Sequence, residues 1–143
     1  MKSSTVLAFD YGLTQIGVAV GTTMLASANP LSIVKAKDGT PNWQVIEKLI
    51  KEWQPAQLIV GLPLNMDGSE ADMSKRARKF AQRLHGRFGL TVELHDERLS
   101  SREARSLIAD GEWAGKPLAH DKIDALAATV ILESWLQYHH KSR

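Results

Sequence analysis

The chain has 143 residues, 43% of them hydrophobic, and a formal net charge of +2. These values predict one globular domain over residues 1–143 with a buried core, and they exclude a membrane span because no apolar run reaches about 18 residues. The absence of cysteine excludes a disulfide framework and a thiolate metal site, and it favours a cytoplasmic location.

The first third of the chain has the pattern of an antiparallel meander. Short apolar runs occupy residues 6–9 and 16–20, and a weaker segment spans 24–34. Glycine-containing turns separate them, as expected between neighbouring antiparallel strands. Apolar residues at helical spacing then predict a helix over 43–53, with Pro41 as its first-turn proline.

The middle of the chain predicts a buried parallel strand followed by a long helix. Residues 58–62 form an uninterrupted apolar run, and a polar loop over 65–72 separates it from a helix that ends near Phe88, before Gly89. Apolar side chains fall on one side of this helix and basic side chains on the other. The basic residues expected to contact phosphates are Lys75, Arg76, Lys79 and Arg83. On charge alone, a solvated helix face explains them equally well.

The last third adds one strand and two helices. Residues 91–95 predict a strand that ends at an acidic pair, and helices are expected over 101–109 and 120–138. The order of the elements predicts an α/β domain with one mixed sheet, antiparallel on one side and parallel on the other.

Three acids stand at the ends of predicted elements: Asp10 after the first strand, Glu97 after the last strand, and Asp124 at the start of the last helix. The carboxyl ends of parallel strands gather at one edge of a sheet, and a helix packed across that edge would bring Asp124 toward Asp10. Carboxylate oxygens are the ligands that Mg²⁺ or Mn²⁺ prefers, and such ions promote the hydrolysis of phosphodiesters. The pattern therefore predicts a metal-dependent catalytic site of Asp10, Glu97 and Asp124. Asp121 is an additional candidate ligand, because it shares a helix face with Asp124.

Each acid also has a purely structural explanation. Asp10 could belong to a turn, because aspartate is common in turns. Asp96 competes with Glu97 for the position that faces the site, because successive strand residues face opposite sides. Glu97 and Arg98 also suit a surface ion pair, and Asp121 suits the N-terminal cap of the last helix.

Two polar residues near these acids are candidates for substrate binding. Asn65 lies just after the apolar run at 58–62, where it would donate a hydrogen bond to a phosphate or sugar, or else form part of a glycine-containing turn. Arg98, next to Glu97, would contact the phosphate that is cleaved, unless it is held in a structural pair.

Four motifs in order carry a resemblance to a known family. They read LAFDYGLTQIGVAVG, LIVGLPLNMDG, HDERLSSREAR and HDKIDALAATVILESW, and they span nearly the whole chain. Together they resemble the YqgF family, described as pre-16S rRNA nuclease or Holliday junction resolvase-like. The resemblance implies an RNase H-like fold, in which helices flank a five-stranded mixed sheet of order 3-2-1-4-5. It implies Asp10, Glu97 and Asp124 as the acidic site, and the pair of Asp121 and Asp124 is similar to the two C-terminal aspartates of RuvC-type resolvases.

The favoured hypothesis is an endonuclease that uses Mg²⁺ or Mn²⁺, hydrolyses ester bonds and matures the 5′ end of pre-16S rRNA in the cytoplasm. Its expected partners are structured RNA and ribosome-assembly intermediates, and no membrane. One alternative is a Holliday junction resolvase acting on branched DNA, and another is a non-catalytic, nucleic-acid-binding ribosome-assembly factor. A kinase or ATPase relative is disfavoured because the chain is too short for two lobes. A monomer or weak homodimer is expected, although a resolvase needs a dimer to cut two strands symmetrically.

Overall fold

The computed structural model describes residues 4–25, 27–100, 112–113, 116–117 and 123–141. The helix predicted over 101–109, the predicted start of the last helix at 120 and the candidate ligand Asp121 lie outside these residues. Among the helices that are described, none is long and apolar enough to cross a membrane.

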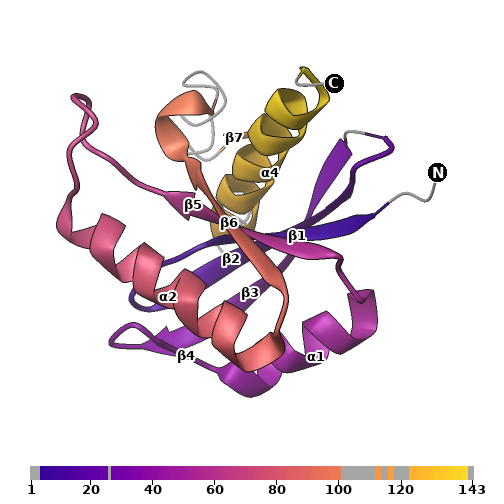
Figure 1. Ribbon diagram of the computed structural model, residues 1–143, viewed down its shortest axis with the longest axis horizontal. Helices are drawn as coiled ribbons and strands as arrows, with labels where there is room; N and C mark the ends of the chain where they lie inside the picture. Colours follow the sequence, from indigo (N-terminus) through magenta and orange to yellow (C-terminus); the bar gives the residue numbers. More distant parts are fainter. Residues whose placement is uncertain (1–3, 26, 101–111, 114–115, 118–122, 142–143) are drawn as a thin grey trace.

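A six-stranded sheet forms the centre of the molecule (Figure 1). Its order is β4-β3-β2-β1-β5-β6, in which β1 pairs antiparallel with β2 and parallel with β5. The strands are β1 (Thr5–Asp10), β2 (Gln15–Thr22), β3 (Ser27–Lys37), β4 (Thr40–Pro41), β5 (Gln57–Leu62) and β6 (Thr91–Asp96). A separate antiparallel pair consists of β7 (Glu112–Trp113) and β8 (Lys116–Pro117). The predicted meander and parallel strands are confirmed, and without β4 the order is the expected 3-2-1-4-5.

The prediction of five strands is wrong by one short strand, β4. Asp38 and Gly39 form a two-residue turn that pairs Lys37 with Thr40, and both turn residues have positive φ, 50° and 84°. An Asp-Gly pair suits this kind of hairpin turn, because both central residues must adopt positive φ. Pro41, expected to begin a helix, instead ends β4, where a proline is tolerated at the sheet edge.

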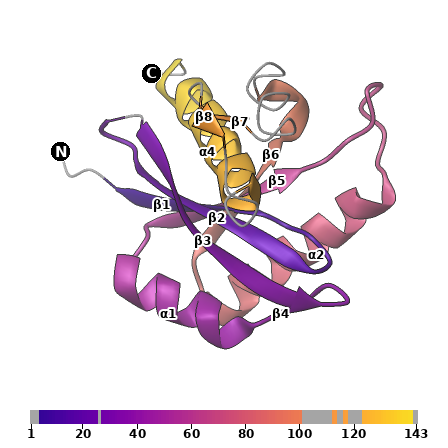
Figure 2. The ribbon, with the colours of Figure 1, turned by 180° about the vertical axis from the view of Figure 1, so that it is seen from behind.

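Helices cover both faces of the sheet (Figures 1 and 2). Helices α1 (Trp43–Trp53) and α2 (Asp72–Phe88) cover one face, and α4 (Ile123–Lys141) covers the other. Strand β1 shows how the sequence divides the core between them. Leu7 and Phe9 belong to the cluster with α1 and α2, whereas Val6 and Ala8 belong to the cluster with α4. Alternate residues of a strand face opposite sides, so the apolar run of β1 is buried on both faces.

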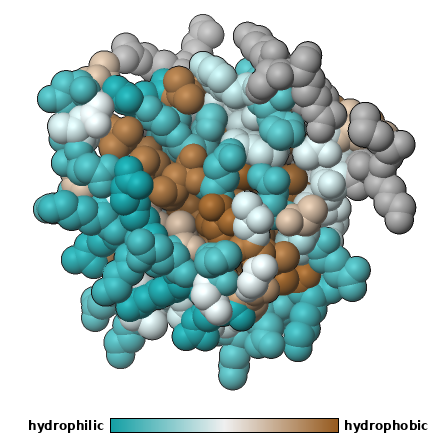
Figure 3. Space-filling view, viewed as in Figure 1, coloured by the Kyte–Doolittle hydropathy of each residue, from teal (hydrophilic) through white to brown (hydrophobic). Residues whose placement is uncertain are grey.

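The amphipathic pattern of α2 is confirmed. Ala77, Phe80, Ala81 and Leu84 are buried, and the basic residues of the opposite side are exposed. Figure 3 shows hydrophilic side chains over α2, beside an apolar area that crosses the middle of this side of the molecule. Gly89 ends α2 in the left-handed conformation, with φ 66°.

The tryptophans of the described helices differ in burial. Trp43 stacks on Phe80 with 5.9 Å between ring centroids, and Trp135 is 4% exposed. Trp53 falls on the apolar stripe of α1 and is nevertheless 38% exposed. It is the last residue of α1, where Gln54 ends the helix in the left-handed conformation.

Helix α4 runs in the opposite direction to β1, β5 and β6. Ile131 lies against Gly61 near the carboxyl end of β5, whereas Leu136 lies against Gly21, which is level with the first residues of β1. The N-terminal turn of α4 therefore lies toward the carboxyl edge of the parallel strands. Asp124 precedes Ile131 by seven residues, which places its backbone up to about 10 Å further in that direction.

A buried histidine joins β6 to α4, and its burial predicts that the stability of the fold depends on pH. His95 is 6% exposed, and its Nε2 lies 2.8 Å from Ser134 Oγ. Burial lowers the pKa of His95, although Glu93 and Asp96 partly oppose the shift. The unfolded chain therefore binds more protons than the folded chain once the pH falls below about 6.5, the ordinary histidine pKa.

We expect the free energy of unfolding to decrease as the pH falls below about 6.5, and His95→Gln to remove much of this decrease. Urea unfolding of both proteins at neutral and at mildly acidic pH measures the effect. His85→Gln, at an exposed position of α2, is the matched control and should leave the pH dependence in place. An unchanged pH dependence in His95→Gln would show that another group is responsible.

Candidate active site

Asp10 ends β1 on the face of the sheet that α4 covers. Ala8 packs in the α4 cluster, and Asp10, two residues later, faces the same side. Phe9 pairs with Val60 on the parallel strand β5, so Asp10 is level with the next residue of β5, Gly61. The candidate acid is therefore at the carboxyl edge, as predicted.

Glu97 reaches the same place from β6. It begins a 3₁₀ turn, η1 (Glu97–Leu99), directly after the strand. A Cβ atom built on Gly61 would lie 3.2 Å from Glu97 Oε2 and 2.6 Å from Ile131 Cδ1. The Glu97 carboxylate thus occupies the space above Gly61, which only glycine leaves open. Asp10 and Glu97 therefore lie on the same face of the sheet, at the ends of the two strands, β1 and β6, that flank β5 and its Gly61.

The contacts of Arg98 show which of the two neighbouring acids, Asp96 or Glu97, faces the candidate site. The Arg98 guanidinium forms a two-pronged ion pair with Asp96, with Nη2 donating to Oδ2 at 2.7 Å and Nε to Oδ1 at 3.1 Å. These hydrogen bonds lower the pKa of Asp96. Asp96 is thus engaged in a structural pair, and Glu97 is the acid that lies over Gly61.

The third predicted acid, Asp124, is in the first turn of α4, so its backbone lies toward the edge that carries Asp10 and Glu97. In the part of the chain with described side chains, no three histidine, aspartate or glutamate side chains gather closely enough to hold a metal ion. Asp10 and Glu97 supply two carboxylates, which are hard oxygen ligands that fit Mg²⁺ or Mn²⁺.

The loop after β5 is braced by its own hydrogen bonds and by Arg98. Asn65 Nδ2 donates to Ser69 Oγ at 3.0 Å, and the Gly68 N–H donates to the Asn65 carbonyl at 2.8 Å. Asp67 accepts from both the backbone and the hydroxyl of Ser69, which lowers the pKa of Asp67. Arg98 Nη1 donates to the Met66 carbonyl at 3.3 Å. The turn expected as the structural alternative for Asn65 is therefore present.

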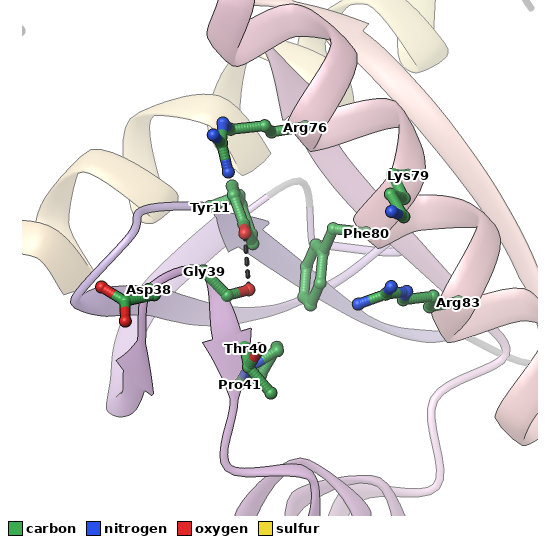
Figure 4. A pocket seen from close by; sticks show the side chains of 9 residues that line it. All are labelled: Tyr11, Asp38, Gly39, Thr40, Pro41, Arg76, Lys79, Phe80 and Arg83. Atoms are coloured by element: carbon green, nitrogen blue, oxygen red, sulfur yellow. Dashed lines mark hydrogen bonds between the residues drawn. The ribbon is translucent and has the colours of Figure 1, made fainter.

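The basic residues of α2 lie on the other face of the sheet from Asp10. Helix α2 packs on the cluster that contains Phe9, whereas Asp10 faces α4. Arg76, Lys79 and Arg83 line a pocket next to Tyr11 (Figure 4). Lys75 is exposed and does not line this pocket. The fold thus places Asp10 and Glu97 on one face of this edge and the pocket-lining cations of α2 on the other.

Two residues of this region are missing from the predicted site. Gly61 makes room for Glu97, and a glycine inside an apolar strand is a recognised signal of such a close approach. Tyr11 donates a hydrogen bond to the Gly39 carbonyl at 2.6 Å and thereby ties the end of β1 to the β3–β4 turn. No local signal reveals this second contact, because 28 residues separate its partners.

Comparisons with known proteins point to one family. The model of the RuvX family, described as Holliday junction resolvase, matches residues 4–138. A protein of Escherichia coli (strain K12 / DH10B) named "Putative pre-16S rRNA nuclease" is 56% identical over 136 residues, which cover 94% of this chain and 97% of the relative. A Salmonella arizonae protein of the same name has the same identity and coverage.

Solved structures confirm the RNase H-like fold. RuvC of Thermus thermophilus, solved in complex with a Holliday junction substrate, has a TM-score of 0.56 at 16% identity and covers 97% of each chain. The yeast mitochondrial Holliday junction resolvase Ydc2 has a TM-score of 0.57 at 11% identity, and the match covers 95% of this chain and 79% of Ydc2. At these identities the likeness concerns the fold alone.

Proposed function

The chain belongs to the RuvX family, and on this basis we propose that it is a metal-dependent endonuclease that matures the 5′ end of pre-16S rRNA. The observation that carries the proposal is the placement of Asp10 and Glu97 at one edge and on one face of the sheet, around Gly61. Two half-buried carboxylates at one edge of the sheet suit a protein that binds a divalent cation. The names of the relatives supply the RNA substrate as a hypothesis.

In this proposal, the ligands of Mg²⁺ or Mn²⁺ are Asp10, Glu97 and Asp124, with Asp121 as a further candidate. The bound ion would supply electrostatic stabilisation for the hydrolysis of a phosphodiester. Glu97 is held in place by the turn η1, whose Ser100 hydroxyl donates to the Glu97 carbonyl at 2.6 Å. Arg98 forms a hydrogen bond to the neighbouring loop and an ion pair with Asp96. The Asp96 carboxylate is therefore not proposed as a further ligand of the metal ion.

The substrate is proposed to be structured RNA held through its phosphates. Lys75, Arg76, Lys79 and Arg83 are exposed on α2 and would bind the backbone without reading its sequence. Asn65 and Arg98 are proposed to border the cleaved strand. We further propose that residues 1–143 form a single domain, which acts in the cytoplasm on ribosome-assembly intermediates as a monomer or weak homodimer.

The second candidate function is the resolution of branched DNA, which the description of the family favours. One cleavage assay separates the two functions. Precursor 16S rRNA and a four-way DNA junction are each incubated with the protein and Mg²⁺ or Mn²⁺, and in parallel with a chelator. We expect cleavage near the 5′ end of the RNA only when the metal is present, and an intact junction. Paired cuts in the junction with intact RNA would assign the protein to the resolvases instead.

A further inference from the structure

A polar pocket of about 220 Å³ lies between α2 and the β3–β4 hairpin, on the face of the sheet away from Asp10 and Glu97. Its lining includes Tyr11, Gly39, Thr40, Arg76, Lys79 and Arg83 (Figure 4). Ligand pockets for drug-sized molecules span about 300 to 1,000 Å³. This pocket therefore suits a small group, such as a single phosphate, better than a whole nucleotide.

The pocket is strongly cationic. Arg76, Lys79 and Arg83 form no ion pair with any residue that the structure describes, and the only acid in the lining is Asp38, whose carboxylate points away from the three basic groups (Figure 4). The pocket thus holds three positive charges with little compensation. Arginine forks and lysine ammonium groups are the donors that bind phosphate most effectively in proteins.

The other cations of α2 are engaged elsewhere or lie outside the pocket. Arg78 forms an ion pair with Glu70 at 2.9 Å, and the Arg87 guanidinium lies 4.2 Å from the centre of a Trp43 ring. Arg76, Lys79 and Arg83 are therefore the basic residues of this helix whose charged groups are placed to bind a ligand in the pocket.

The walls of the pocket are fixed by the fold. Tyr11 Oη donates to the Gly39 carbonyl at 2.6 Å, and the Gly39 N–H donates to the Leu13 carbonyl at 2.8 Å. Phe80, at the base, is 2% exposed and packs against Tyr11 with 5.0 Å between ring centroids. A pocket with preformed walls loses little conformational entropy on binding a ligand.

The pocket is adjacent to the candidate active site along the chain. Tyr11 directly follows Asp10, and the two residues belong to opposite faces of the sheet. A nucleic acid strand that contacts both the pocket and the candidate active site must pass over the end of β1.

We propose that this pocket binds one backbone phosphate of the nucleic acid substrate, distinct from the phosphate that is cleaved. The inference rests on the proposed function for the identity of the substrate. The new element is that the protein contacts its substrate on both faces of the sheet, at the carboxyl edge of the parallel strands. Losing this phosphate contact should weaken substrate binding, and it should not change the rate at which a fully bound substrate is cleaved.

The test compares Lys79→Ala/Arg83→Ala with Lys48→Ala/Lys51→Ala. The second variant loses the same charge from exposed positions of α1, outside the pocket. Binding of a precursor 16S rRNA fragment is measured with chelator present, so that cleavage plays no part. We expect the pocket variant to bind about tenfold or more weakly. The slope of log affinity against log salt should also fall by about one, as for the loss of one phosphate contact. The control should match the wild type in both measurements.

A second measurement identifies the ligand class without RNA. NMR spectra of the full chain are recorded with increasing inorganic phosphate at constant ionic strength. We expect saturable shifts of the Gly39 and Thr40 amides in the wild type and in the control, and none in the pocket variant. Equal RNA affinities for the two double variants, or phosphate shifts confined to other residues, would overturn the inference. Failure of RNA cleavage alone would count against the proposed function and not against this pocket.

Discussion

Asp10→Asn is expected to reduce metal-dependent cleavage by about a thousandfold. Asp10 is at the carboxyl edge of β1, level with Gly61, on the face where Glu97 also lies. Removing one of its two carboxylate oxygens lowers the affinity for the divalent cation. It also lowers the electrostatic stabilisation of the transition state, a contribution of several kcal/mol. Single-turnover cleavage of precursor 16S rRNA at saturating protein, over a range of Mg²⁺ and Mn²⁺ concentrations, measures the loss.

The control for Asp10→Asn is Glu52→Gln, which removes the same charge at an exposed position of α1, outside both the candidate active site and the basic pocket. Glutamine and glutamate have similar helix propensities, so this control should fold and cleave normally. Asp10→Asn should also bind RNA as well as the wild type in chelator. Cleavage at the wild-type rate by Asp10→Asn would reject the proposed mechanism and favour a non-catalytic role in ribosome assembly.

Gly61→Ala is expected to affect both stability and cleavage. The added methyl group would lie 2.6 Å from Ile131 Cδ1 and 3.2 Å from Glu97 Oε2. Ile131 belongs to the packed α4 core, so overpacking should cost about 1 to 3 kcal/mol of the free energy of unfolding. The displaced Glu97 carboxylate should lower cleavage by about a hundredfold, because misplacement of a catalytic group by about 1 Å has an effect of this size.

The matched control for Gly61→Ala is Gly86→Ala. Gly86 is an exposed residue of α2, and a Cβ atom there would meet nothing within 4 Å. This variant should gain up to about 1 kcal/mol of stability, because alanine favours the helix, and it should keep full activity. Chemical denaturation and the cleavage assay are applied to both proteins. If Gly61→Ala cleaves as fast as Gly86→Ala, then the position of Glu97 over Gly61 has no bearing on the reaction.

The two substitutions also test whether Asp10 and Glu97 act together. If both act through one bound cation, then the double variant Asp10→Asn/Gly61→Ala should cleave scarcely more slowly than Asp10→Asn alone. Residues that act as one unit show such non-additive effects. Fully multiplicative losses would place the two acids in separate roles.

The sequence by itself determined most of the fold. The apolar runs that became β1, β2 and β5 were recognisable because strands buried on both faces need uninterrupted apolar residues. Helix α2 was recognisable because its apolar residues recur at helical spacing. The hairpin at Asp38-Gly39 was missed even though its turn residues are typical, because β4 has only two residues and no apolar pattern of its own.

The tertiary structure alone decided how the candidate site is assembled. Sequence order places Asp96 and Glu97 side by side, and only the pairing of Arg98 with Asp96 shows that Glu97 lies over Gly61. The basic pocket is likewise invisible in the sequence, because it combines the end of β1, the β3–β4 turn and one side of α2. Local patterns report which residues form a strand or helix. Contacts between distant segments depend on how the strands pair and on which face each side chain takes, and these are properties of the assembled sheet.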